Sequence, residues 1–322
     1  MAPRPDEIKI VYTAMHGVGT KTLQRVFHRA GFPSLILVES QSQPNPDFPT
    51  VAFPNPEEPG ALDLALETAK TFDADLVIAN DPDADRCSVA IKDRDLNWRV
   101  LRGDEIGAIL GEVIARNAQT GTLANSIVSS SILSKIAAKY TLNFQETLTG
   151  FKYIAKISDL LFGYEEAIGF CVDSHTVNDK DGISAALMIA QIATDLKKEG
   201  KSLNDLLEDI WKTYGFHATE QISIRVTDLD LISTIMKKLR TNPMSHIAGF
   251  KVLSMDDLTK PTNSLPPTDG LRFTLEENIR IIIRPSGTEP KIKCYIEIVN
   301  SEKSISLSLL EQLRPSLREL LS

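Results

Sequence analysis

Residues 75–86, with the sequence DLVIANDPDADR, give the clearest indication of the fold. The first half is a nearly continuous apolar run, which is typical of a strand buried on both faces of a parallel sheet. The second half is an acidic loop that begins where the apolar run ends. Because α/β proteins bind ligands at the carboxyl ends of the sheet strands, this stretch predicts a parallel sheet with a candidate site at its edge.

The sequence on both sides of this stretch completes an α/β domain. Upstream, apolar runs alternate with helical patterns as in a β-α-β unit, and a proline-rich segment follows at residues 43–60. Downstream, SVAIKD and WRVL predict a hairpin at the edge of the sheet. We therefore expect residues 1–99 to form one domain. Its expected elements are strands at 8–13, 35–39 and 75–80, helices at 21–30 and 61–72, and hairpin strands at 88–93 and 98–101.

The rest of the chain predicts two further domains, at residues 100–215 and 216–322. The expected fold class is α/β: two α/β/α domains with mixed, largely parallel sheets are followed by an α+β domain with an antiparallel sheet. The middle domain is expected to have helices at 104–116, 132–140, 152–161, 182–198 and 203–214 and strands at 126–130 and 144–148. The last domain is expected to have strands at 222–226, 250–255, 272–277, 279–285 and 292–299, a helix at 229–239 and a closing helix.

The composition is that of a globular protein. The 322 residues carry 35 Lys and Arg against 43 Asp and Glu, and the formal net charge of −8 opposes binding to nucleic acid. No apolar run approaches the ~20 residues that cross a bilayer, and the N-terminus has no signal-peptide pattern. The three cysteines lack the spacing of a zinc site or a disulfide framework. We expect a cytoplasmic protein with reduced thiols and with neither nucleic acid nor membrane as a partner.

The acidic loop predicts a metal site. Asp81, Asp83 and Asp85 alternate after the apolar strand, so that in extended backbone their carboxylates can converge on one hard cation, for which Mg²⁺ is the expected ion. An EF-hand is excluded because its glycine and glutamate positions hold Arg86 and Lys92. The alternative is a solvated acidic turn. Arg86 lies beside the carboxylates, suits a phosphate group and is a candidate catalytic residue.

The segment RPSGTEPK, which also follows an apolar strand, predicts a phosphate site. Arg284 and Lys291 supply positive charge. Ser286 and Thr288 offer hydroxyl groups, and Gly287 allows the backbone to approach a ligand closely. The segment is not a Walker loop. A structural turn is the alternative, and the two flanking cations favour the anion-binding interpretation.

Two segments of the middle domain are weaker candidates. In TGFKYI, Lys152 could contact a phosphate at a helix start, and in GYEEAIGF, Glu165 could accept hydrogen bonds from sugar hydroxyls. The alternatives are a solvated helix residue for Lys152 and an exposed turn for Glu165. For His16, in YTAMHGVGT, we favour a structural role in a glycine-containing turn.

Taken in order, YTAMHGVG, NDPDADR, TGFKYI, GYEEAIGF, NDKDG and RPSGTEPK resemble the landmarks of the α-D-phosphohexomutases, the phosphoglucomutase and phosphomannomutase family. The resemblance covers essentially the whole chain, but only the second, third and fourth domains of a four-domain family. It implies that Asp81, Asp83 and Asp85 bind Mg²⁺ and that Glu165 contacts the sugar. It also implies that the loop from Arg284 to Lys291 holds the phosphate that is not reacting.

The resemblance implies a mechanism that this chain does not fully contain. Family members phosphorylate a sugar monophosphate from a phosphoserine in a TASHNP-like loop, and the bisphosphate then reorients and returns its other phosphate. No such loop occurs in the sequence, and Ser129, Ser130 and Ser131 do not resemble it. The chain is therefore interpreted as a truncated product, a fragment or one half of a split enzyme whose partner chain supplies the serine.

Two functions remain as hypotheses. The first is a phosphosugar mutase, and the second is a catalytically silent module that binds sugar phosphates. The substrate stays open among the phosphates of glucose, mannose, glucosamine and pentoses, because one matched glutamate does not fix hydroxyl stereochemistry. The sequence EEAIG is closer to the branch that includes phosphopentomutases, with Ala167 where many relatives carry Ser.

Overall fold

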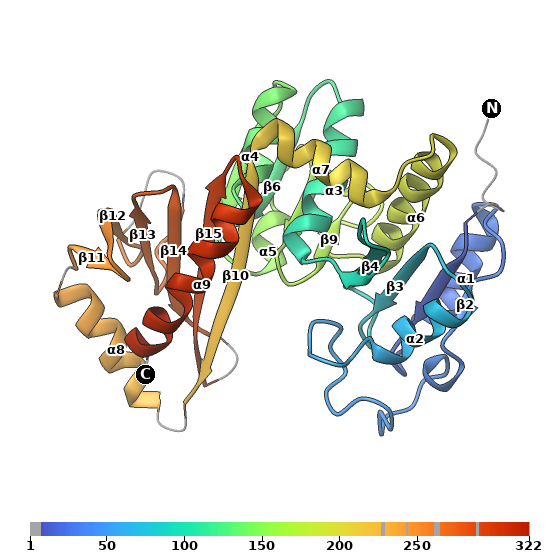
Figure 1. The fold of residues 1–322 in the computed structure, drawn as a ribbon, viewed down its shortest axis with the longest axis horizontal. Coiled ribbons are helices and arrows are strands. Elements are labelled where there is room, and N and C mark those ends of the chain that lie inside the picture. The colour runs from blue at the N-terminus through green and yellow to red at the C-terminus, as the bar shows by residue number, and fades with distance from the viewer. Residues whose placement is uncertain (1–7, 227–228, 243, 261–264, 288–289, 322) are drawn as a thin grey trace. The chain divides into compact units, whose positions relative to one another are not determined.

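The computed structural model describes residues 8–226, 229–242, 244–260, 265–287 and 290–321. The chain divides into two compact units (Figure 1). The first consists of Met1–Ser129 and Leu133–Ile210, and the second of Ser130–Ile132 and Trp211–Ser322. Among the described residues, no helix is both long enough and apolar enough to span a membrane.

The first unit contains the predicted sheet around the acidic loop. Five strands lie in the order β2-β1-β3-β4-β5. β1 pairs in parallel with β2 and β3, whereas β4 and β5 add antiparallel pairs at the edge, which confirms the predicted edge hairpin. All residues of β3 are buried, as its continuous apolar run predicts. The strands are β1 (Ile10–Thr13), β2 (Ile36–Leu37), β3 (Leu76–Asn80), β4 (Cys87–Lys92) and β5 (Trp98–Val100).

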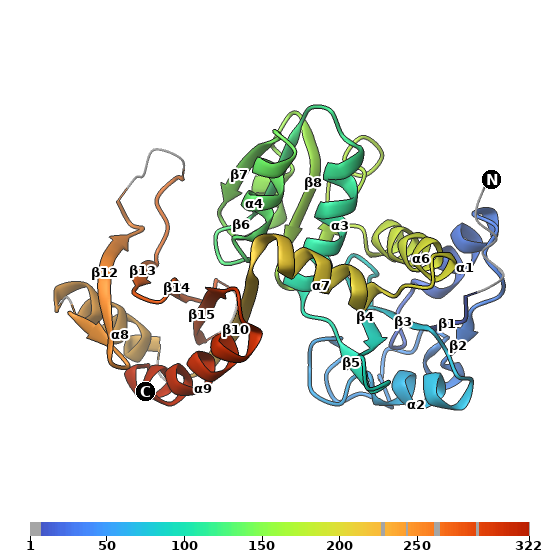
Figure 2. The ribbon, with the colours of Figure 1, turned by 45° about the horizontal axis from the view of Figure 1, so that its top comes forward.

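Helices α1 (Thr20–Arg29), α2 (Asp63–Thr71) and α6 (Gly182–Lys198) accompany this sheet. Leu23 and Phe27 of α1, four residues apart on one face, are buried. α6 lies beside α1 (Figures 1 and 2) and also contacts β3 and β4. A helix that the sequence assigns to the middle domain therefore packs against the first sheet.

A second sheet in the same unit has four strands in the order β7-β6-β8-β9. β6 pairs in parallel with β7 and β8, and β8 forms an antiparallel hairpin with β9. The sheet is therefore mixed and largely parallel, as predicted. The strands are β6 (Thr122–Ser126), β7 (Asn143–Thr147), β8 (Leu160–Glu165) and β9 (Gly169–Cys171), and the helices are α3 (Gly103–Asn117), α4 (Ile132–Lys139), α5 (Phe151–Ile154) and α7 (Leu203–Tyr214).

Two predictions for this part of the chain are wrong. The strand expected at residues 126–130 is instead β6, and residues 127–130 form the turn after it. The polar residues of β6 hide it from an apolar pattern, although all five of its residues are buried. The helix expected at residues 152–161 ends at Ile154, and Leu160 begins β8. Pairing of β8 with β6 overrides the local helical preference.

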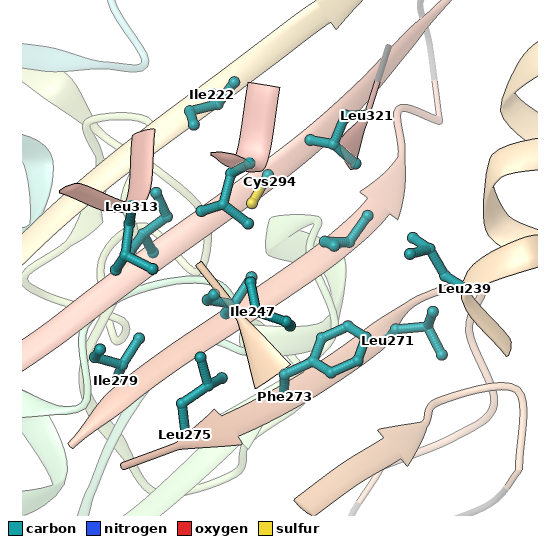
Figure 3. Close-up of a cluster of buried hydrophobic side chains, with 14 of the residues drawn as sticks. Ile222, Leu239, Ile247, Leu271, Phe273, Leu275, Ile279, Cys294, Leu313 and Leu321 are labelled. Carbon is teal, nitrogen blue, oxygen red and sulfur yellow. The ribbon is translucent and has the colours of Figure 1, made fainter. Parts of the chain in front are cut away.

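The second unit has an antiparallel sheet with strands in the order β10-β15-β14-β13-β12-β11, which confirms the predicted α+β fold. Figure 3 shows its apolar core, to which inward residues such as Phe273, Ile279 and Leu313 contribute. The elements are β10 (Phe216–Arg225), β11 (His246–Ile247), β12 (Phe250–Asp257), β13 (Leu271–Leu275), β14 (Ile279–Pro285), β15 (Lys291–Asn300), α8 (Leu229–Thr241) and α9 (Lys303–Leu320).

A buried carboxylate, Glu297 of β15, has an unusual number of partners in the second unit. It accepts hydrogen bonds from the Ser130 hydroxyl (2.6 Å) and the Ser131 backbone N–H (2.8 Å). Arg280 Nη2 lies 2.8 Å from Glu297 Oε2, and His217 Nδ1 lies 3.0 Å from Oε1. Burial acts to raise the pKa of Glu297, but Arg280 and His217 hold that pKa far below its ordinary value. Glu297 thus stays ionised inside the fold.

Candidate functional site

The acidic loop brings the three predicted aspartates together at the carboxyl end of β3. One carboxylate oxygen from each of Asp81, Asp83 and Asp85 lies within 4.8 Å of the other two. Asp81 is buried, and burial raises its pKa to about 6 in spite of the neighbouring Arg86. Three carboxylates so close together suit a hard divalent cation, because a cation offsets both their repulsion and the cost of burial.

The loop is held in shape by the turn that follows β1. A Cβ on Gly17 would lie 2.4 Å from Cα and the carbonyl oxygen of Pro82, so only glycine fits there. The Val18 N–H donates to the Pro82 carbonyl at 2.8 Å. His16 Nε2 lies 2.8 Å from Thr50 Oγ1, so the imidazole tethers this turn to the proline-rich segment. The structural role expected for His16 agrees with this contact.

Two cations contact the aspartates. Arg86 donates from Nε to Asp81 Oδ2 at 2.7 Å and from Nη1 to the amide oxygen of Asn55 at 3.1 Å. Lys180 Nζ lies 2.6 Å from Asp85 Oδ2. Neither Lys180 nor Asn55 was singled out from the sequence. The NDKDG motif, which lies in the loop between β9 and α6, could have identified Lys180 as a candidate. No sequence motif identifies Asn55 as a candidate.

The two weaker motifs of the middle domain meet in the structure. Glu165, the last residue of β8, accepts a hydrogen bond from the Gly150 N–H through Oε1 at 2.6 Å. Glu165 is half-buried, and it lies at the end of a hairpin strand rather than in the loop that the sequence suggests. Lys152 is exposed, and its Nζ lies 5.2 Å from the centre of the Tyr153 ring. The structure therefore joins the two motifs through Glu165 and Gly150.

Glu166 is a further titratable residue that the sequence analysis did not select. Its Oε2 lies 3.1 Å from the hydroxyl oxygen of Ser126 and 3.2 Å from that of Ser129. Its N–H donates to Ser129 Oγ at 3.0 Å. Burial, reinforced by Asp104 and Glu165, raises the pKa of Glu166 to about 7. Ser129 is thereby occupied by a structural hydrogen-bond network.

The predicted phosphate segment lies in the second unit, where β14 turns into β15. Arg284 and Lys291 lie in these two strands, and both are half-buried. The Ser286 N–H donates to the Lys291 carbonyl at 2.8 Å, and Gly287 is exposed at the turn. Thr288 lies outside the described residues. Backbone hydrogen bonding thus places the described residues of the segment on one tight connection.

The strand register adds positive charge beside this connection. Arg284 lies opposite Lys293, and Lys291 lies opposite Arg225 of β10. Directly opposed residues of antiparallel strands share a face, as do residues two apart in one strand. These four cations therefore occupy one face at this end of the sheet, which suits an anion.

The comparisons with known proteins match nearly the whole chain. Models of the phosphoglucomutase/phosphomannomutase family match residues 2–94 (alpha/beta/alpha domain II), 102–214 (alpha/beta/alpha domain III) and 222–307 (C-terminal domain). A probable phosphomannomutase of Haemophilus influenzae is 50% identical over 90% of this chain and 60% of its own length. The human phosphopentomutase is 35% identical over 99% of this chain and 57% of its own length.

A solved structure has the same fold. Parafusin, a phosphoglucomutase from Paramecium, superposes with a TM-score of 0.74 at 21% identity, over 98% of this chain and 58% of its own. The chain thus spans about 60% of the length of the relatives it matches.

Proposed function

The chain belongs to the phosphoglucomutase/phosphomannomutase family, and we propose that it carries the metal-binding and substrate-binding parts of a phosphosugar mutase. Such an isomerase interconverts sugar 1-phosphates and 6-phosphates through a bisphosphate intermediate. The observation that carries the proposal is the convergence of the Asp81, Asp83 and Asp85 oxygens within 4.8 Å, with Arg86 bonded to the first of them. We propose that the three functional regions follow the predicted domains, 1–99, 100–215 and 216–322.

Asp81, Asp83 and Asp85 would hold Mg²⁺. When bound, the ion would stabilise the negative charge that moves during phosphoryl transfer. Arg86, whose guanidinium is fixed beside the same carboxylates, would bind an oxygen of the transferring phosphoryl group. The acidic loop would then have two roles: its carboxylates would hold the cation, and Asp81 would orient Arg86.

Glu165 would accept hydrogen bonds from sugar hydroxyls, and Lys152 would contact the sugar or its phosphate. The non-reacting phosphate would be bound by the segment of the second unit, with Arg284 and Lys291 supplying charge. Ser286, Gly287 and Thr288 would supply further donors there. The relatives include a phosphomannomutase and a phosphopentomutase, so both hexose and pentose phosphates are candidate substrates.

The chain as given has no phosphoserine loop of the family type. Ser129 bonds to Glu166, and Ser130 to Glu297, which favours structural roles for both. We therefore expect this chain by itself to bind Mg²⁺ and a sugar phosphate without appreciable turnover. The comparisons give no support to a separate chain that supplies the phosphoserine, because this chain matches only about 60% of the length of relatives that are single chains.

Calorimetry of Mg²⁺ binding tests the central assignment. Asp83→Ala should weaken Mg²⁺ binding at least about tenfold, because a carboxylate ligand is lost. Asp95→Ala, in the exposed turn between β4 and β5, is the matched control and should bind as the parent does. Equal Mg²⁺ affinity for the parent and Asp83→Ala would refute the assignment. Titrations with glucose 1-phosphate and ribose 1-phosphate then distinguish hexose from pentose recognition.

A further inference from the structure

The proline-rich segment at residues 43–60 contains two similar tetrapeptides, PNPD at 44–47 and PNPE at 54–57. In each one, the asparagine side-chain oxygen accepts a hydrogen bond from the N–H two residues later. The distances are 3.0 Å from Asp47 N to Asn45 Oδ1 and 3.2 Å from Glu57 N to Asn55 Oδ1. Local turn chemistry therefore explains both asparagines equally well.

Only the second tetrapeptide reaches a candidate catalytic residue. Asn55 Oδ1 also accepts a hydrogen bond from Arg86 Nη1 at 3.1 Å, and Glu57 Oε2 lies 3.9 Å from the same nitrogen. Asp81 Oδ2 holds Arg86 Nε at 2.7 Å. Asp81 thus holds Nε of the guanidinium, and Asn55 holds Nη1. Within the part of the chain that the structure describes, Arg86 Nη2 has no such partner and stays available to a ligand.

The segment that carries Asn55 is itself anchored. Val51 is buried in a cluster with Met15, in the turn after β1, and Ala79 of β3. Pro54 and Pro56 flank Asn55 and restrict its backbone, because each proline ring fixes one φ angle and limits the residue before it. The Glu57 N–H holds the side-chain oxygen of Asn55 at 3.2 Å on this restricted backbone, so the oxygen is a preorganised acceptor for Arg86.

We propose that Asn55 is a positioning residue, which aims the free edge of Arg86 at the anionic group of the substrate. This inference rests on the proposed function, because it takes Arg86 to bind a phosphoryl oxygen. A neutral amide suits the task, since it orients the guanidinium without cancelling its charge.

The test compares Asn55→Ala with Asn45→Ala, which removes the same turn bond from the sister tetrapeptide. The probe is glucose 1,6-bisphosphate, titrated calorimetrically at saturating Mg²⁺. Asn55→Ala should bind the probe about tenfold more weakly, as is typical when a group that orients a ligand-binding side chain is removed. Asn45→Ala should bind it as the parent does. An equal loss in both variants would overturn the proposal, because the turn alone would then be responsible.

A double-mutant cycle distinguishes positioning from a structural effect. In an Arg86→Gln background, Asn55→Ala should cause no further loss of affinity, because its effect passes through Arg86. A full additional loss in that background would overturn the proposal. Asn55→Asp keeps the acceptor oxygen, so it should keep the guanidinium ordered while lowering affinity through its added charge.

A measurement without ligand separates this inference from the proposed function. The ¹⁵N relaxation of Arg86 Nε reports the order of the guanidinium in the free protein. It should show greater mobility in Asn55→Ala and parent-like order in Asn55→Asp and Asn45→Ala. Unchanged Arg86 order in Asn55→Ala would refute the positioning role even if the parent binds the bisphosphate. A parent that fails to bind the bisphosphate would refute the proposed function, whatever the relaxation data show.

Discussion

Replacing Glu166 by Gln should remove a pH dependence from the stability of the first unit. The pKa of Glu166 is raised from 4.5 to about 7, chiefly by burial and further by Asp104 and Glu165. The folded protein therefore keeps a proton that the unfolded chain releases near its ordinary pKa. The stabilisation linked to this proton is complete below pH 4.5 and is lost as the pH rises through about 7.

The magnitude follows from the size of the shift. A change from 4.5 to about 7 at 1.36 kcal/mol for each pH unit corresponds to about 3 kcal/mol in the free energy of unfolding. Gln has nearly the shape of the protonated acid and can still bond to the hydroxyls of Ser126 and Ser129. Glu166→Gln should thus lie within about 1 kcal/mol of the parent at pH 5 and exceed it by up to about 3 kcal/mol at pH 8.

Urea unfolding at half-unit steps from pH 5 to pH 8 measures this difference for both proteins. Titrating groups that do not interact with Glu166 contribute equally to both proteins and cancel in the difference, whereas Asp104 and Glu165 are coupled to Glu166 and titrate as part of its effect. Glu67→Gln, on the exposed face of α2, controls for the loss of one acidic residue. A difference between Glu166→Gln and the parent that does not change from pH 5 to pH 8 would refute the reasoning. The ¹³C shift of the Glu166 carboxyl carbon provides the direct check of its titration.

Three further predictions concern other parts of the molecule. Glu297→Gln should destabilise the second unit by about 3–5 kcal/mol, because it removes the buried negative charge that lies 2.8 Å from Arg280 Nη2. Since the pKa of Glu297 is depressed, urea titrations should show this loss above pH 4.5 and a smaller one in acid. Gly17→Ala should cost about 1–3 kcal/mol by forcing its Cβ against Pro82, and should weaken Mg²⁺ binding measured by calorimetry. Arg284→Lys should weaken glucose 6-phosphate binding by ~1–3 kcal/mol if the contact is bidentate, without lowering the melting temperature, and unchanged affinity would assign that segment a structural role.

Local pattern predicts the parts of this fold in which burial and sequence periodicity agree. β3 is identifiable because its residues are apolar up to the Asn that ends the strand, and the three aspartates that follow lie at alternate positions of one short loop. The antiparallel sheet of the second unit is equally accessible, since Ile279, Ile281 and Ile283 alternate toward its core. In such segments, the spacing of the apolar residues predicts both the type of element and the side that is buried.

Local sequence patterns do not predict which residues that are distant in sequence contact one another. β6 is missed because Thr122, Asn125 and Ser126 are polar, and they are tolerated only where partners satisfy them, such as Asp159 for Thr122. Ser126 and Glu166 are 40 positions apart, and Asn55 and Arg86 are 31 apart. No local signal encodes these pairings, so the raised pKa of Glu166 and the second partner of Arg86 require the three-dimensional structure.

The NDKDG motif shows how one short segment serves the aspartate loop in three ways. Lys180 contacts Asp85, and the carboxylate of Asp181 accepts the N–H groups of residues 183 and 184, which caps the start of α6. A Cβ on Gly182 would lie 2.2 Å from the carbonyl oxygen of Arg86, and the Gly182 N–H donates to the Ala84 carbonyl at 3.1 Å. The start of α6 therefore holds the backbone of the loop at Ala84, and the turn after β1 holds it at Pro82. A cation site built on alternate residues of one loop needs such support, because an unsupported loop would relieve the repulsion among its carboxylates by spreading them apart.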